Sequence, residues 1–311
     1  MLPKKLTHIS LKAPRFFASD WFSTTHIEKD NYFVSTQPAD TNIVDSLSFC
    51  EELKFVDIIN NNSSVRCVIT NEKLRDKLDR RLGIIISKNP KLDFFHFHNK
   101  IAKNIENEPL FGPRIESTAE IHSTAYVEDN CYIGHAVCVG PGARILRNSY
   151  IDKEVIIGPN VVIGSEGLEF RKQEKGSYLK IIHIGGVYLG PKVEIMANSV
   201  ICKNVYLGFT EIASGTKIGP LCDVAHRTTI GENCLIAGNS TIGGSAKIGS
   251  FVWIGPSATI SDGVRVGDYA RVHLGSVVAK DVKQGQKVSG IFAIDHLKAL
   301  KEYAYLSSEK K

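Results

Sequence analysis

The feature that most constrains this chain is an aliphatic residue that recurs at every sixth position. The series begins at Ile115, is interrupted after Ile163, and runs without a break from Ile212 to Val278. A period of six fits neither the 3.6-residue period of an α-helix nor the two-residue alternation of a half-buried strand. It is typical of a triangular coil in which each hexapeptide supplies one short strand and one corner. Three hexapeptides then complete one coil.

The residues around each aliphatic position support the same interpretation. Glycine often follows it, as in Ile218-Gly219 and Ile230-Gly231, and we expect this glycine or another small residue to ease the corner. A shorter series from Leu189 to Leu207 keeps the period before the register slips by one residue. The pattern predicts a mainly β protein built on a left-handed parallel β-helix. A chance run of β-forming residues in a sandwich is the alternative, and the length of the series argues against it.

The repeat also divides the chain. Residues 1–110 lack the period and alternate short apolar runs with helix-compatible stretches, which predicts a small α/β domain. Residues 111–284 form the predicted β-helix, and residues 285–311 a tail with a helix over 294–305. Polar residues and two glycines interrupt the repeat over 165–184, which predicts an excursion loop that reaches over a neighbouring subunit or a substrate.

Composition excludes several classes of protein. The net charge of +5 is compatible with an anionic nucleotide substrate or an acidic partner, and no basic block indicates nucleic-acid binding. Seven cysteines without a CxxC pair indicate reduced thiols in a cytoplasmic protein. Neither a signal-peptide core nor a run of 18 apolar residues is present, so we expect no secretion signal and no membrane span. The histidines of Phe95-His96-Phe97-His98 have no partners that would complete a zinc site, so no metal is expected.

The strongest candidate for chemistry is His226. Val224 points into the prism, so His226, two positions later, faces outward near a corner, and Gly244 lies one full coil further on. An amine nucleophile must lose a proton before it attacks, and histidine titrates in the right range to accept it. A glycine N–H can approach the resulting oxyanion without a clashing Cβ. We therefore predict His226 as general base and the Gly244 N–H as oxyanion donor; the alternative is that His226 is one more solvent-facing wall residue.

Other histidines remain secondary candidates. His135 and His273 fall within hexapeptides, and His183 lies in the excursion loop. Asp223 is placed to orient His226, although a solvated corner carboxylate is an equal alternative.

Several blocks of the sequence resemble a known family. These blocks are Lys217 to His226 (KIGPLCDVAH), Ile236 to Ser245, Ser48 to Phe55 (SFCEELKF), Asn89-Pro90 and Ser289-Gly290. Together they are similar to the UDP-3-O-acylglucosamine N-acyltransferases of the lipid A pathway. The resemblance implies that Phe49 and Phe55 hold a pyrimidine base between their rings, which is physically reasonable for two aromatic faces. The alternative is that both phenylalanines are core residues of the small domain.

The resemblance also implies the reaction and the assembly. The acyl donor would be an acyl-CoA or acyl-carrier-protein thioester, used as a co-substrate without a bound cofactor, a metal or a covalent intermediate. β-Helices of this kind pack their flat faces together, so a homotrimer is expected by analogy of architecture.

Three features of the sequence differ from the family pattern. Arg227 follows the histidine where the family has asparagine, Glu52 and Phe55 replace an asparagine and a tyrosine, and no histidine occurs in Ser261 to Val264. These differences favour another nucleotide-linked (UDP or dTDP) amino sugar as acceptor, in O-antigen or other surface polysaccharide biosynthesis. The lipid A enzyme itself is the first alternative. A zinc-dependent carbonic-anhydrase-like β-helix and a structural, ice-binding β-helix are the others.

Overall fold

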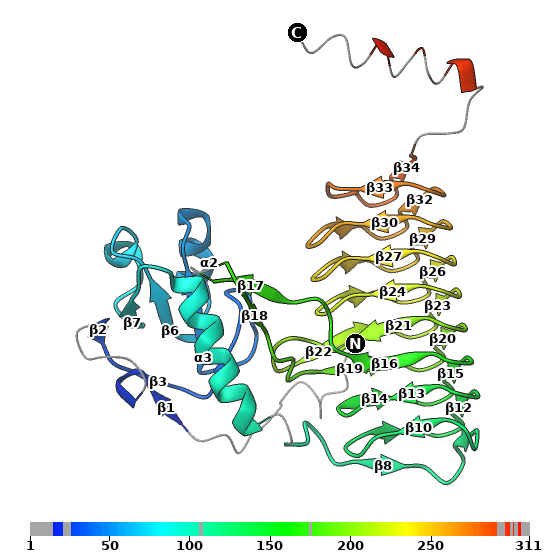
Figure 1. Cartoon of the computed structure of the whole chain (residues 1–311), viewed down its shortest axis with the longest axis horizontal. Coiled ribbons are helices and arrows are strands. Elements are labelled where there is room, and N and C mark those ends of the chain that lie inside the picture. The colour runs from blue at the N-terminus through cyan, green and yellow to red at the C-terminus, as the bar shows by residue number, and fades with distance from the viewer. Residues whose placement is uncertain are drawn as a thin grey trace.

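Three parallel sheets form the walls of a prism in the computed structural model, which describes residues 15–20, 26–105, 108–173, 176–290, 296–298, 301 and 304–305 (Figure 1). The first wall contains β8 (Arg114–Ile115), β11 (Tyr132–Ile133), β14 (Ser149–Ile151), β19 (Gly186–Leu189), β22 (Phe209–Ile212), β25 (Thr229–Ile230), β28 (Lys247–Ile248) and β31 (Arg265–Val266). The second contains β9 (Glu120–Ile121), β12 (Cys138–Val139), β15 (Ile156–Ile157), β20 (Glu194–Ile195), β23 (Lys217–Ile218), β26 (Leu235–Ile236), β29 (Trp253–Ile254), β32 (Arg271–Val272) and β34 (Lys287–Val288). The third contains β10 (Tyr126–Val127), β13 (Arg144–Ile145), β16 (Val162–Ser165), β21 (Val200–Cys202), β24 (Asp223–Val224), β27 (Thr241–Ile242), β30 (Thr259–Ile260) and β33 (Val277–Val278).

The aliphatic series forms the core of the prism. Val224, Ile242, Ile260 and Val278 are register partners on successive coils, and all four are buried. Burying one such side chain stabilises the fold by about 1.5–3 kcal/mol, so the continuous column explains why the period is kept. The predicted left-handed parallel β-helix is confirmed.

The corners are built differently from the expectation. The glycine that follows the aliphatic residue has an ordinary φ angle, and the left-handed conformation falls two residues later, at Arg227, Asn233 and Asn239. The glycine is needed for a different reason: a Cβ at Gly231 would lie 2.5 Å from the backbone of Gly249 on the next coil. Close packing between coils, rather than the turn itself, explains these glycines.

The chain leaves the prism twice. The first excursion forms the antiparallel hairpin of β17 (Phe170–Lys172) and β18 (Tyr178–Lys180). The sequence did not predict the second excursion. Leu189 pairs with Ile212, which follows it by 23 positions instead of the usual 18. Leu207 is therefore not an inward residue of the prism, as its spacing had suggested, but packs in the core of the N-terminal domain. An aliphatic residue at the right spacing is equally suited to either core, so the period alone misplaced it.

The N-terminal α/β domain is built on a five-stranded sheet in the order β2 (Ile27–Lys29), β7 (Gly83–Ile86), β6 (Val65–Thr70), β5 (Ser46–Cys50), β4 (Ser35–Thr36), in which only β2 is antiparallel to its neighbour. Its remaining elements are β1 (Phe16–Phe17), β3 (Tyr32–Phe33), α2 (Val56–Asn61), α3 (Pro90–Ile105) and the short 3₁₀ turns Ala18–Asp20, Leu53–Phe55 and Arg75–Lys77. The excursion hairpin lies between α3 and the prism (Figure 1). Asn99 of α3 bonds the backbone of Lys180 and Ile182, so the hairpin joins the two parts of the molecule.

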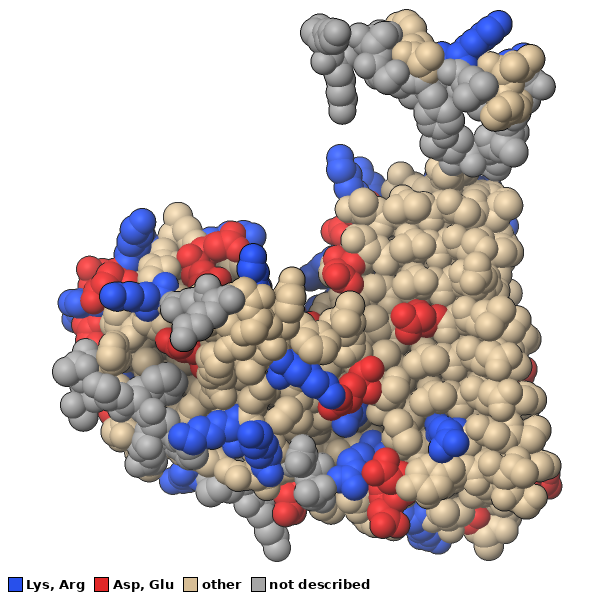
Figure 2. Space-filling model, viewed as in Figure 1, with Lys and Arg blue, Asp and Glu red and all other residues tan. Residues whose placement is uncertain are grey.

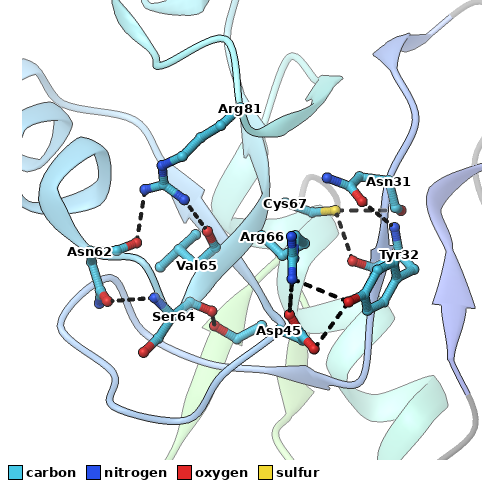
Figure 3. Close-up of polar contacts among 10 residues, drawn as sticks. Asn31, Tyr32, Asp45, Asn62, Ser64, Val65, Arg66, Cys67 and Arg81 are labelled. Atoms are coloured by element: carbon cyan, nitrogen blue, oxygen red, sulfur yellow. Dashed lines mark hydrogen bonds and ion pairs between the residues drawn. The ribbon is translucent and has the colours of Figure 1, made fainter.

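Two arginines fix the loops of this domain (Figure 3). Arg81 donates to the carbonyl oxygens of Asn62 and Val65, at 2.8 and 2.7 Å, which satisfies acceptors that follow the end of α2. Arg66 binds Asp45 at 2.6 Å and also donates to the Tyr32 hydroxyl. These bonds join the segments that lead into the central strands β5, β6 and β7.

All seven cysteines are free thiols, and only Cys138 is exposed. In the part of the chain that the structure describes, no helix is long and apolar enough to cross a membrane. Half of the predicted helix over 294–305 lies outside the described residues, and the described half is helical.

Candidate functional site

The site is organised around one corner of the prism. The Ser245 N–H donates to the His226 carbonyl and the Gly263 N–H donates to that of Gly244, both at 2.9 Å, so His226, Gly244 and Asp262 lie on three successive coils. A Cβ at Gly244 would be 2.9 Å from Cε1 of His226, which shows how closely the ring packs on this glycine. The structure thus brings His226 and Gly244 together.

A residue of the excursion loop completes the site. Oε2 of Glu169 lies 3.1 Å from Nε2 of His226, and only 16% of the histidine side chain and 12% of the glutamate side chain are exposed. Nδ1 of His226 is buried and, among the described residues, has no hydrogen-bond partner. Gly167 covers that side of the ring, because a Cβ there would lie 3.0 Å from Nδ1. The carboxylate that contacts the histidine is therefore Glu169 and not Asp223, which is exposed.

Arg171 holds Glu169 in place. Its guanidinium pairs with the Glu169 carboxylate, and its Cζ lies 4.7 Å from the centre of the Phe95 ring. Phe95 is a buried residue of α3, so this contact ties the position of the carboxylate to the packing of the N-terminal domain.

The charges around His226 oppose one another. Burial lowers the pKa of His226 below its ordinary value of 6.5, Asp262 acts to raise it, and Arg227 and Arg171 lower it further. Burial raises the pKa of Glu169, against the influence of Arg171 and Lys91. A neutral imidazole beside a carboxylate can accept a proton and be stabilised once it has done so.

The Gly244 N–H already has a partner. It donates to Oδ1 of Asp262 at 2.6 Å, and hydrogen bonds to a carboxylate are in general shorter and stronger than those to a neutral acceptor. An oxyanion at this position would have to replace the carboxylate, which would otherwise repel it.

A cleft of about 460 Å³ adjoins this corner and is bounded by both domains. Arg227, Ser245 and Gly263, which follow the three stacked site residues, line it. Phe49 and Phe55 line the opposite side and are both half-buried. Phe49 also packs on Phe94, 5.0 Å away between ring centres, so it serves the core and the cleft at once. The other apolar lining residues are Pro38, Ala39, Ile58, Phe95 and Tyr206.

Cations outnumber anions in this cleft. The cationic lining residues are Lys91, Arg171, Arg227, Lys247 and Arg265. Among the described residues that line it, Asp40 alone is acidic, and it pairs with both Arg227 and Lys247. Figure 2 shows charged side chains on either side of the hollow between the domain and the prism, whereas much of the prism face in view is uncharged. A positive cleft with aromatic walls suits an anionic ligand that carries a flat ring.

The secondary candidates lie in different places. His183 is buried with its ring centre 5.6 Å from that of His226, but Ile181 and Gly167 bind its two nitrogens through their backbones. Burial lowers the pKa of His183 to about 4, so its ring is neutral and structural. His135 bonds Thr118 and His273 packs on Trp253, and neither residue lines this cleft.

No group of three His, Cys, Asp or Glu side chains that could hold a metal ion occurs among the described residues. His98, from the Phe-His-Phe-His run, lies in the helix α3. Its ring nitrogens form hydrogen bonds with the Thr36 hydroxyl and the Ile182 carbonyl oxygen.

Sequence reasoning missed Glu169, Arg171, Asp40 and Lys91. The broken repeat indicates that the segment around Glu169 leaves the prism, but no local pattern shows which of its side chains returns to His226. Asp40 and Lys91 belong to a domain without a repeat, where spacing carries no positional information.

Part of the prism matches a family model for six-residue repeats. The family model described as bacterial transferase hexapeptide (six repeats) matches residues 209–244 and 245–280. The first of these stretches contains His226.

Curated relatives with a shared name are similar to this chain. The UDP-3-O-acylglucosamine N-acyltransferase of Acinetobacter baylyi is 28% identical over 185 residues, which cover 50% of each protein. That of Coxiella burnetii is 27% identical over 221 residues, which cover 58% of this chain and 59% of the relative. The chain thus spans little more than half the length of the relatives it matches. The predicted resemblance is confirmed.

A solved UDP-N-acetylglucosamine acyltransferase from Campylobacter jejuni is also similar, with 24% identity and a TM-score of 0.43, over 54% of this chain and 68% of that one.

Proposed function

We propose that the protein transfers an acyl group from a CoA or acyl-carrier-protein thioester to the amine of a nucleotide-linked amino sugar. The observation that carries the proposal is the largely covered His226 side chain between Glu169 and Gly244, at the edge of a cationic cleft that contains Phe49 and Phe55. The base, its orienting carboxylate and a binding surface for an anionic nucleotide occur together there.

In the proposed reaction, His226 takes a proton from the sugar amine as the nitrogen attacks the thioester carbonyl. The new C–N bond forms, the C–S bond breaks, and the proton passes from the imidazolium to the leaving thiolate. Glu169 keeps the ring in position and stabilises its charged form. The Gly244 N–H is the proposed oxyanion donor, which requires Asp262 to exchange its bond to this N–H for another partner.

For the acceptor, the names of the relatives support UDP-3-O-acylglucosamine, as in lipid A biosynthesis. A different UDP- or dTDP-linked amino sugar, for O-antigen synthesis, is the second candidate. Two positions that differ from the family pattern, Arg227 and Asp262, favour this candidate. Arg227 pairs with Asp40, and Asp262 accepts the Gly244 N–H, so both take part in the contacts of the site.

The test is release of free thiol from acetyl-CoA, 3-hydroxybutyryl-CoA and a 3-hydroxyacyl carrier protein, each with UDP-3-O-acylglucosamine or with UDP- and dTDP-linked amino sugars. Release that depends on UDP-3-O-acylglucosamine and the carrier protein identifies the lipid A reaction. Release with CoA and another amino sugar identifies the second candidate. If no combination releases thiol and forms an amide, the proposed activity is wrong.

We also propose a homotrimer with its prisms side by side. Large apolar side chains remain exposed along the prism, among them Ile156, Leu221 and Leu235. Light scattering of the purified protein tests this, since a monomeric mass would contradict it.

A further inference from the structure

Asp262 caps a backbone N–H of the preceding coil, as an aspartate also does at the neighbouring corner. Its Oδ1 accepts the N–H of Gly244, 18 residues earlier, at 2.6 Å, and Oδ1 of Asp268 accepts the N–H of Ser250 in the same way at 2.7 Å. At the coil before, Ser250 Oγ accepts the N–H of Glu232 at 3.1 Å. A short oxygen-bearing side chain at this position therefore caps the corner of the preceding coil, and the negative charge of aspartate is not needed for the cap.

Only one of the two aspartates lies beside the candidate base. Asp262 is the next residue in the stack above His226 and Gly244, and its charge acts on both His226 and Glu169. Asp268 occupies the neighbouring corner. The residue that follows Asp262, Gly263, lines the cleft that adjoins His226, whereas neither Asp268 nor the residue that follows it does.

The charge on Asp262 is not neutralised by the protein. Of the other carboxylates at the site, Glu169 pairs with Arg171, and Asp40 pairs with Arg227 and Lys247. Within the described ranges, Asp262 forms no ion pair and its one hydrogen bond is to a backbone N–H. Its side chain is exposed, so a ligand can reach it. The cleft next to it is lined mainly by cations, and the lining carboxylate of Asp40 is already paired with Arg227 and Lys247. Among the described carboxylates at the site, Asp262 is therefore the one available to a positive ligand atom.

We propose that Asp262 is the specificity-determining residue for the acceptor: it binds the protonated amine of the sugar and, in turning toward it, releases the Gly244 N–H for the thioester carbonyl. This rests on the proposed acyl transfer. A sugar amine reaches the enzyme mostly as an ammonium ion, and a carboxylate is its natural partner. His226 first takes one proton from this ammonium and passes it to solvent. The neutral amine then attacks the thioester carbonyl, and the second proton travels from the nitrogen through His226 to the leaving thiolate.

The inference explains why a corner that binds an amine can reject a hydroxyl. A sugar with a hydroxyl in place of the amine brings no charge to Asp262, so the bond from Gly244 is kept and the oxyanion donor stays occupied. Discrimination of a charged from a neutral group at a partly exposed carboxylate is expected to be roughly three- to tenfold in affinity.

The test uses UDP-glucosamine and UDP-glucose, which differ in having an amine or a hydroxyl at one carbon. Calorimetry measures the dissociation constant of each for the full chain and for Asp262→Asn, Asp262→Ser and Asp268→Asn. We expect the wild type and D268N to bind the amine roughly three- to tenfold more tightly, and both Asp262 variants to bind the two sugars equally. The serine variant keeps a capping oxygen of the kind that Ser250 supplies, so it separates loss of charge from loss of the cap.

Two outcomes overturn the inference. One is that the Asp262 variants keep the preference of the wild type for the amine; the other is that the wild type has none. Neither bears on catalysis, because thiol release with an acyl donor is measured separately. If the wild type acylates an amino sugar while D262S retains the amine preference, the proposed function stands and the role of Asp262 does not.

Discussion

Two neighbouring corners of the prism are built alike and differ in what faces them. One consists of His226, Gly244 and Asp262, and the other of Glu232, Ser250 and Asp268 at equivalent positions of the next hexapeptide. In both, the backbone bonds between coils measure 2.8–2.9 Å, and an aspartate caps the N–H of the preceding coil. At the first corner Glu169 and Gly167 of the excursion loop cover His226, whereas Glu232, at the equivalent position of the second, is exposed.

The comparison shows that the repeat determines where the residues of a corner lie, whereas the excursion loop determines the environment of their side chains. An outward histidine on a bare wall would titrate as an ordinary surface residue. Covered by the loop, His226 is largely withdrawn from water, its pKa is lowered by burial, and a carboxylate contacts its ring. Predictions that change one corner and its twin in parallel test this account directly.

The largest expected effect is on turnover. His226→Ala removes the proposed base, and we expect kcat to fall by roughly 10²–10⁴-fold, the usual contribution of general-base catalysis. Binding of the UDP-sugar should change little, because the cleft residues are untouched. Glu232→Ala at the twin corner should leave kcat unaltered. Steady-state kinetics with calorimetry checks both; a fully active H226A enzyme would falsify the assignment of the base.

The second prediction concerns the packing of the ring. A Cβ at Gly244 would lie 2.9 Å from Cε1 and 3.0 Å from Nε2 of His226, so Gly244→Ala must displace the imidazole. A shift of about 1 Å at a reacting group costs up to about a hundredfold in rate. We expect kcat to fall by roughly ten- to a hundredfold with little loss of thermal stability. Ser250, the twin residue, already carries a Cβ, and Ser250→Ala is the control, with unchanged kcat. Equal losses of kcat in both variants would contradict a special role for this corner.

These two corners also show how far the sequence alone could lead. The period of six fixed the strands, the inward column and the stacking of His226 on Gly244, because all three follow from a constant register. It misplaced Leu207, since an aliphatic residue at the right spacing can serve another core. It could not reveal Glu169 or the bond from Gly244 to Asp262. Both depend on side-chain contacts between segments, for which the repeat carries no signal.

The third prediction tests the loop that distinguishes the corners. His226 acts as a base only when unprotonated, so kcat/KM falls as the pH drops through its pKa. Because burial lowers this pKa, we expect the acid limb of the pH–rate profile to lie below pH 6.5. Glu169→Gln removes a carboxylate that favours the imidazolium, so the limb should move to still lower pH while the plateau falls roughly tenfold.

Glu166→Gln is the matched control for this change. Glu166 lies in the same loop but pairs with Lys180, at 2.5 Å. Its replacement should leave the limb and the plateau where they are. A pH–rate profile of E169Q that coincides with that of E166Q would show that the contact with His226 has no kinetic role.

The smallest expected effect concerns the third corner of the prism. Leu221 adopts the left-handed conformation there, with a φ of 58°, and its side chain is 60% exposed. Asn239 holds the same position one coil further on, with a φ of 59°. Because asparagine tolerates this conformation better than leucine, Leu221→Asn should stabilise an isolated chain by about 1 kcal/mol. Thermal unfolding at several protein concentrations measures the change. If Leu221→Asn instead lowers the unfolding temperature, and does so more at protein concentrations where the wild type is a trimer, then Leu221 is buried by a second copy. The corner would then be retained for assembly at the expense of local backbone strain.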